Sequence, residues 1–122
     1  KWGVPINMGP LVNTEFDETS AYLSPDGSRL LFASKGHYNM GGYDLFYCEI
    51  FENGSLSEAV NMGFPVNTTN NNLYFSPVKD GMSGIYSIRS DEGPGNEDIW
   101  YIEIMPHSKH IPKSCVNTLT NK

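Results

Sequence analysis

The chain has 122 residues, the size of one ordinary domain, and eight basic residues against fourteen acidic ones give it a formal net charge of −6. An acidic body repels phosphate backbones, so nucleic-acid binding is disfavoured, and no apolar run approaches the roughly 18 residues that a membrane span needs. The 7 Tyr, 6 Phe and 2 Trp, together with 12 Gly and 8 Pro, favour many short strands joined by turns.

Residues 1–15 are predicted to be a linker, in which Val4–Met8 supplies an outer strand to a preceding sheet. Residues 16–62 form a first unit, whose first two strands are joined by a turn containing Asp26 and Gly27. An Asp-Gly pair tolerates the positive φ of a tight turn, and the proline before it presets the turn entry. The four predicted strands of this unit are Thr19–Leu23, Arg29–Ala33, Tyr43–Ile50 and Leu56–Met62.

Residues 63–104 form a second unit with predicted strands at Asn72–Ser76, Ile85–Ile88 and Ile99–Ile104. A basic tail follows at residues 105–122, where Ile111–Val116 either completes the last sheet or hangs free. A solvated terminus is the expectation for this tail, and contact with an anionic surface is the alternative. No stretch of the chain has the apolar period of a useful amphipathic helix.

The two units repeat each other at an offset of 54 residues, with 13 identities across residues 2–50. The identities cluster at turns and strand ends, and we interpret the repeated Asn, Asp and Gly positions as structural: Asn13, Asp26, Gly27 and Asp44 in the first unit, and Asn67, Asp80, Gly81 and Asp98 in the second. A short carboxylate before a strand accepts backbone N–H bonds and ties a loop to that strand.

Short strands with glycines at fixed offsets favour an all-β fold built from two four-stranded antiparallel β-propeller blades over a sandwich. A closed propeller needs about 4–8 blades, so the others must come from the same longer chain or from self-assembly. The sequence begins inside a linker motif, which favours a piece of a longer chain; three copies of two blades would make six.

Three motifs, Ser24-Pro25-Asp26-Gly27, Leu31-Phe32-Ala33-Ser34 and Gly41-Gly42-Tyr43-Asp44-Leu45, resemble the TolB-type, WD-like β-propeller repeat. The linker from Asn7 to Thr14, repeated from Asn61 to Thr68, is similar to a subset of that family found in envelope proteins of Bacteroidetes-type bacteria. In those proteins the propeller accompanies tetratricopeptide repeats and an OmpA-like peptidoglycan-binding domain, in some cases within secretion machinery. The resemblance implies a six-bladed ring, a periplasmic or cell-envelope location, and contacts with other proteins.

No catalytic residue, metal ligand or cofactor is predicted. The histidines are His37 in a loop and His107 and His110 in the tail, and no serine-hydrolase pattern accompanies them. The acidic loop from Asp91 to Asp98 offers oxygen ligands that suit calcium but lacks the alternating ladder of a dedicated calcium loop, so a solvated turn is favoured. Pairing of Cys48 with Cys115 is left open, and Cys48 is interpreted as a small buried apolar residue.

Protein binding is the predicted function, with its contacts on the loop from Gly36 to Tyr43. This loop concentrates four candidate contact residues: His37, Tyr38, Met40 and Tyr43. Aromatic and methionine side chains on a loop are suitable anchors for a partner, although Tyr38 and Met40 can equally cover the top of the core.

Two alternatives remain open from the sequence. The first is a regulatory propeller attached to a hydrolase domain outside this segment. The second is a small oligomeric carbohydrate-binding propeller, in which Trp2 and Trp100 stack on sugars. Trp100 aligns with Phe46 at the 54-residue offset, which favours a place in the core for it.

Overall fold

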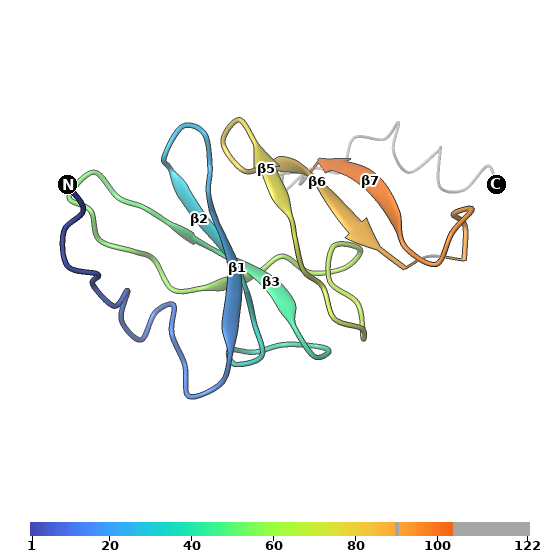
Figure 1. Ribbon diagram of the computed structural model, residues 1–122, viewed down its shortest axis with the longest axis horizontal. Coiled ribbons are helices and arrows are strands. Elements are labelled where there is room, and N and C mark those ends of the chain that lie inside the picture. The colour runs from blue at the N-terminus through green and yellow to red at the C-terminus, as the bar shows by residue number, and fades with distance from the viewer. Residues whose placement is uncertain (90, 104–122) are drawn as a thin grey trace, which may run out of the picture.

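The computed structural model describes residues 1–89 and 91–103. The all-β prediction is confirmed: these residues contain strands and no helix, arranged as two antiparallel sheets in the orders β1-β2-β3-β4 and β5-β6-β7. It follows that no helix in the described part of the chain is long and apolar enough to cross a membrane. The strands are β1 Glu18–Leu23, β2 Arg29–Ser34, β3 Asp44–Glu49, β4 Val60–Asn61, β5 Ser76–Val78, β6 Ser83–Ile88 and β7 Asp98–Glu103 (Figure 1).

The β1–β2 and β5–β6 turns have the predicted Asp-Gly chemistry. Gly27 and Gly81 adopt φ of 74° and 83°, which only glycine reaches without strain. Asp26 Oδ1 accepts hydrogen bonds from Ser28 N and Ser24 Oγ at 3.0 and 2.8 Å, and Asp80 Oδ1 accepts one from Met82 N at 3.0 Å. Each aspartate therefore stabilises its own turn.

The fourth predicted strand, Leu56–Met62, is wrong in extent: only Val60–Asn61 pairs with β3, and Leu56 makes an isolated bridge to Ile50. The reason lies in Ser57, whose Oγ accepts a hydrogen bond from Glu49 N at 2.8 Å. A side chain thus takes the place of a backbone partner at this point of the β3 edge, and the ladder is interrupted.

The predicted strand Asn72–Ser76 is also wrong, because β5 begins at Ser76. Tyr74 adopts a left-handed φ of 62°, which breaks an extended strand. Asn72 N donates to Tyr43 O, at the end of the β2–β3 loop, at 2.7 Å, so the segment before β5 is bound to that loop. The second sheet has three strands within the described residues, not the four predicted, and residues 104–122 lie outside them.

The two sheets share one strand register. Every β6–β7 pair is the corresponding β2–β3 pair moved by 54 residues; Ala33 opposite Leu45, for example, corresponds to Ser87 opposite Ile99. The irregular position in β1 at Ser20, with φ of 53°, likewise corresponds to Tyr74. Equivalent residues of the two sheets therefore face equivalent directions.

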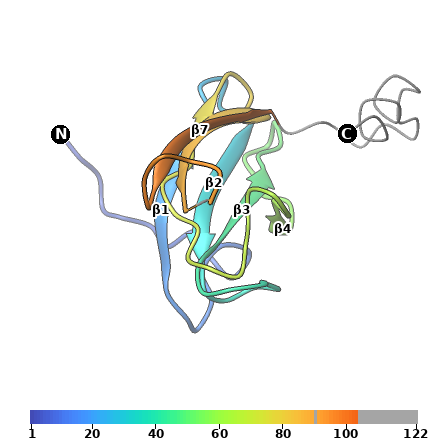
Figure 2. The same ribbon diagram turned by 90° about the vertical axis from the view of Figure 1, so that its right-hand side faces the viewer.

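The main core lies between the sheets, which stack face against face along the long axis of the molecule (Figures 1 and 2). Residues of both sheets and of the connecting linker form it: Leu31, Ala33, Leu45, Val66, Phe75 and Tyr86. Because side chains alternate along a strand, the opposite face of the first sheet carries a second cluster, formed by Val12, Phe32, Phe46 and Cys48. Burial raises the pKa of the free Cys48 thiol, which is therefore neutral at pH 7. Cys115, with which pairing was left open, lies outside the described residues.

The two linkers, residues 7–14 and 61–68, share several of their hydrogen bonds, although only the second contains a cis peptide bond, Phe64–Pro65. Gly9 N donates to Asn7 Oδ1 at 2.8 Å and Gly63 N donates to Asn61 Oδ1 at 2.7 Å. Asn13 N donates to Gly9 O at 2.9 Å, and the same bond between residues 67 and 63 measures 2.8 Å. Each Asn-Met-Gly…Val-Asn-Thr segment therefore forms a preorganised turn before its sheet. Val4–Met8, the predicted outer strand, is not in a strand, and Val4 is exposed.

The carboxylate of Glu18 closes the first linker onto its sheet. Burial raises its pKa, but hydrogen bonds from Thr14 Oγ1 (2.6 Å), Ser34 Oγ (2.7 Å) and Thr14 N (3.1 Å) outweigh that effect and hold the pKa below the ordinary 4.5. The folded state thus favours the ionised form. The stability from this group is fully present above the ordinary pKa and is lost as the pH falls through the lowered one.

We expect Glu18→Gln to make the fold less sensitive to acid. In the wild type, Glu18 binds a proton more readily in the unfolded chain than in the folded chain, and glutamine removes this difference. The measurement is the free energy of unfolding by urea at pH 7 and at pH 3. The difference between the two values should be smaller in Glu18→Gln than in the wild type, whereas Glu52→Gln, at an exposed turn, should keep the wild-type difference. An unchanged difference in Glu18→Gln would contradict the assignment.

Candidate functional site

The loop from Gly36 to Tyr43 joins β2 to β3 and is fixed by its own hydrogen bonds. Gly36 N donates to Ser34 Oγ at 2.9 Å, and a Cβ at Gly36 would collide with the side chain of Thr14. Asn39 Nδ2 donates to Lys35 O and Gly42 O at 2.9 and 3.2 Å, so it bridges the two ends of the loop. These hydrogen bonds tie the two ends of the loop together.

Asp44 connects this loop to the strand and to the linker. Its side chain is fully buried, and Oδ2 accepts hydrogen bonds from Met40 N at 2.7 Å and Asn61 Nδ2 at 3.0 Å. Asn61 Nδ2 also donates to Tyr38 O at 3.2 Å. The counterpart Asp98 is half-exposed and accepts from Gly95 N at 3.3 Å.

Two of the four predicted contact residues point inward. The His37 ring lies with its centroid 5.7 Å from that of Phe32 and 5.2 Å from that of Phe46. Its Nε2 lies 2.9 Å from the carbonyl oxygen of Val12, an acceptor, so Nε2 carries the proton and donates. Tyr43 packs against the core between the sheets, and Lys35 Nζ lies 4.8 Å from its ring centroid.

The other two contact residues point to solvent. Tyr38 is 94% exposed and Met40 is 46% exposed. Tyr38 therefore covers no core within the described residues, which removes that alternative for its side chain. The structure thus brings together an exposed aromatic ring and an exposed thioether on one fixed loop, which we call the Tyr38 surface.

The counterpart loop in the second sheet carries the acidic residues between Asp91 and Asp98. Within residues 1–89 and 91–103 there is no group of three His, Cys, Asp or Glu side chains that could hold a metal ion. Asp91 and Glu97, two acidic residues of the loop that was predicted to be a solvated turn, are exposed. His107 and His110 lie outside the described residues.

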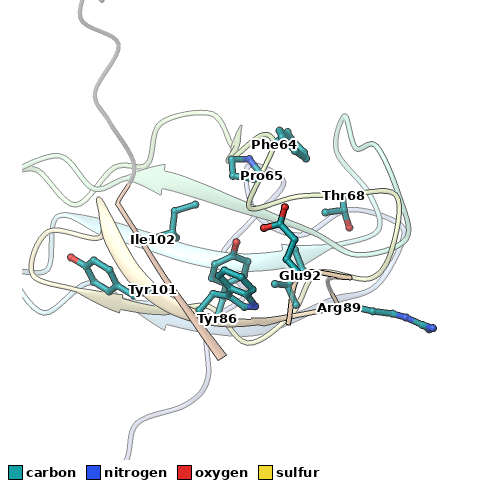
Figure 3. A pocket seen from close by; sticks show the side chains of 10 residues that line it. Phe64, Pro65, Thr68, Tyr86, Arg89, Glu92, Tyr101 and Ile102 are labelled. Carbon is teal, nitrogen blue, oxygen red and sulfur yellow. The ribbon is translucent and has the colours of Figure 1, made fainter. Parts of the chain in front are cut away.

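A pocket of about 400 Å³ lies between the linker and the inner face of the second sheet (Figure 3). Phe64 and Pro65 form one side, Tyr86 lies on the sheet side, and Arg89 extends away from the pocket. Trp100 of β7 also lines the pocket. The indole Nε1 of Trp100 is buried and has no hydrogen-bond partner among the described residues. Burial raises the pKa of the Tyr86 hydroxyl, so it remains a neutral donor.

The origin of this pocket lies in a difference between the two units. At the 54-residue offset Tyr86 and Trp100 correspond to Phe32 and Phe46, the two rings that His37 covers in the first sheet. The residue that corresponds to His37 is Asp91, which is exposed. Sequence reasoning identified Trp100 but not the pocket; the loss of His37 from the repeat was the available signal.

Comparisons with protein-family models, with curated proteins and with solved structures found no match. The likeness to the TolB-type repeat therefore rests on the motifs in this sequence alone.

Proposed function

We propose that this chain is a non-catalytic β-propeller module that binds a protein partner in the bacterial cell envelope through the Tyr38 surface. The observation that carries this proposal is the 94% exposure of Tyr38 on a loop whose backbone is fixed by Asp44 and Asn61. An aromatic side chain on a preorganised loop loses little conformational entropy on binding, so most of its contact energy contributes to affinity.

Two features support the propeller part of the proposal. The two sheets stack face against face with one register, and a linker with the same Asn-to-Gly hydrogen bond precedes each of them. A stacking rule of this kind continues naturally to further sheets, and the family resemblance suggests six in a ring. The envelope location and a link to secretion or peptidoglycan-associated machinery rest on that resemblance.

The test is the capture of proteins from an envelope extract by the immobilised chain, quantified by mass spectrometry. We expect Tyr38→Ala with Met40→Ala to reduce the captured partner by at least about tenfold, the usual loss at a central aromatic anchor. Phe51→Ala, which also truncates an exposed aromatic residue, is the matched control and should capture the partner normally. Equal capture by the wild type, the Tyr38→Ala/Met40→Ala variant and Phe51→Ala would refute the assignment. Loss of cooperative melting in the Tyr38→Ala/Met40→Ala variant would also refute it.

A second candidate function is carbohydrate binding in the Trp100 pocket. The observation that favours it is the buried indole N–H without a partner, beside the ring of Tyr86. Aromatic faces and unpaired donors are the groups that bind sugar rings and hydroxyls. In a Trp2→Phe background, oligosaccharide titration should change the fluorescence of Trp100, and Trp100→Phe should abolish the response. No response to any oligosaccharide would exclude this function.

A further inference from the structure

β7 is an open edge in the described part of the chain. It ends the second sheet, whereas its counterpart β3 is covered by β4 (Figure 2) and by the linker that follows β4. An open edge presents unpaired backbone N–H and C=O groups and is a template for another strand.

The covered edge shows what such a partner has to provide. Asn61 and Val60 pair with Phe46 and Tyr47. Beyond them Leu45 N donates to Asn67 Oδ1 at 2.7 Å, and Leu45 O accepts from Asn67 Nδ2 at 2.8 Å and from Met62 N at 3.0 Å. The fully buried Asn67 side chain thus satisfies both backbone groups of one β3 residue.

Ile99 is the counterpart of Leu45 on β7. Because Ser87 opposes Ile99 as Ala33 opposes Leu45, the N–H and C=O of Ile99 point to the open edge. The face around it is also uncovered. Ile99 is 73% exposed and Ile85 is 44% exposed, whereas their counterparts Leu45 and Leu31 are each 1% exposed beneath the second sheet.

Residues 6–14 carry the matching surface. They repeat the Asn-Met-Gly…Val-Asn-Thr linker. Three of their internal hydrogen bonds match those of residues 61–68, which we call the seated linker because it is bound at the β3 edge. Asn13 Nδ2 donates to Asn7 Oδ1 at 3.1 Å as Asn67 Nδ2 donates to Asn61 Oδ1 at 2.8 Å, but Asn13 Oδ1 accepts no hydrogen bond from any described residue. Ile6 is 88% exposed. The N-terminal residues lie at the opposite end of the long axis from the second sheet (Figure 1).

We propose that the open edge of β7 binds residues 6–14 of a second copy of this chain, head to tail. Asn7 and Ile6 of the incoming copy pair with Trp100 and Tyr101, and its Asn13 side chain bonds to the N–H and C=O of Ile99. The first sheet of that copy then covers the exposed face at Ile85 and Ile99. This contact leaves the far ends of both copies open, so it closes into a ring or continues as a filament.

The competing occupant is the chain's own tail, where Val116-Asn117-Thr118 repeats the tripeptide a third time. Residues 111–115 before it are Ile-Pro-Lys-Ser-Cys, so the tail lacks the Asn-Met-Gly part of the linker. In the seated linker that part supplies the strand pairing at Asn61 and its bond to Asp44. Residues 6–14 carry the complete set, which favours the second copy.

The test uses a fluorescent peptide of residues 1–16 and the full-length chain with Asn13→Ala, whose own donor segment is disabled but whose β7 edge is intact. We expect saturable binding by fluorescence anisotropy. A peptide with Asn7→Ala and Asn13→Ala should bind at least about tenfold more weakly. It loses the Asn13 bonds to Ile99 and the Asn7 bond to Asp98, which corresponds to the bond of Asn61 to Asp44. Ile99→Asp in the receiving chain should abolish binding, and Leu23→Asp, at another exposed apolar residue, should not.

Absence of peptide binding overturns the proposal. So does binding that appears only when Asn117→Ala is added to the receiving chain, because the tail then holds the edge. The inference builds on the proposed stacking of sheets but does not depend on the Tyr38 surface. A receiving chain with Tyr38→Ala should therefore bind the peptide normally, which separates a failure here from a failure of the proposed function.

Discussion

Replacing Asn67 with alanine is expected to lower the free energy of unfolding by about 3 kcal/mol, because it leaves buried backbone groups unpaired and opens a cavity. The Asn67 side chain is fully buried and bonds to Leu45 N, Leu45 O and Asn61 Oδ1. Alanine removes all three bonds. Leu45 N loses its partner at the β3 edge, while Leu45 O keeps only the bond from Met62 N. Urea unfolding followed by circular dichroism measures the loss.

Asn13→Ala is the matched control, since Asn13 is the same residue in the same local turn. Its side chain is half-buried and makes one hydrogen bond, to Asn7. At concentrations where the chain is monomeric, its replacement should lower the free energy of unfolding by less than about 1 kcal/mol. Similar losses in the two variants would show that Asn67 stabilises only its own turn and that its hydrogen bonds to Leu45 at the β3 edge contribute little.

Gly41→Ala is expected to lower the free energy of unfolding by about 2 kcal/mol, within the usual range for overpacking. A Cβ at residue 41 would lie 2.7 Å from Thr68 O and 2.8 Å from Asn70 O. Both oxygens belong to the backbone, so the contact cannot be relieved by a change of side-chain rotamer. The β2–β3 loop must instead move away from residues 68–70. The thermal midpoint should fall, and the Tyr38 surface should lose its fixed position along with the loop.

Gly95→Ala is the control for this prediction, because Gly95 corresponds to Gly41 in the repeat. The nearest atom to its added Cβ is Asp98 Oδ1 at 3.3 Å, on a side chain that can adjust. The free energy of unfolding should therefore change by less than about 0.5 kcal/mol, as at most surface positions. A larger loss at residue 95 than at residue 41 would contradict the described packing of the two loops.

Local sequence patterns predicted the strands and turns correctly where neighbouring residues alone determine the structure. The apolar and aromatic runs Arg29–Ala33 and Tyr43–Ile50, with the Asp-Gly turn before the first of them, predicted β2 and β3 to within one residue at each end. The errors at β4 and β5 come from long-range hydrogen bonds. The Ser57 side chain replaces a backbone partner of Glu49, and Asn72 N donates to Tyr43 O. Neither contact can be predicted from the residues immediately around it.

The candidate site was predicted as a loop but not in its details. The composition of residues 36–43 identified Tyr38 and Met40, and only the fold separated them from His37 and Tyr43, because inward and outward directions on a loop have no period. The 54-residue repeat did contain the information for the Trp100 pocket and for the open edge. In each case a contact of the first unit has no counterpart in the described part of the second: the His37 ring over Phe32 and Phe46, and the linker at the β3 edge.

Hydrogen–deuterium exchange at the Ile99 amide tests most directly the claim that these sheets bind further sheets of the same kind. We expect this amide to be protected at high protein concentration, as the Leu45 amide is at every concentration, and to exchange rapidly on dilution. Rapid exchange at all concentrations, or protection that does not change on dilution, would contradict the account.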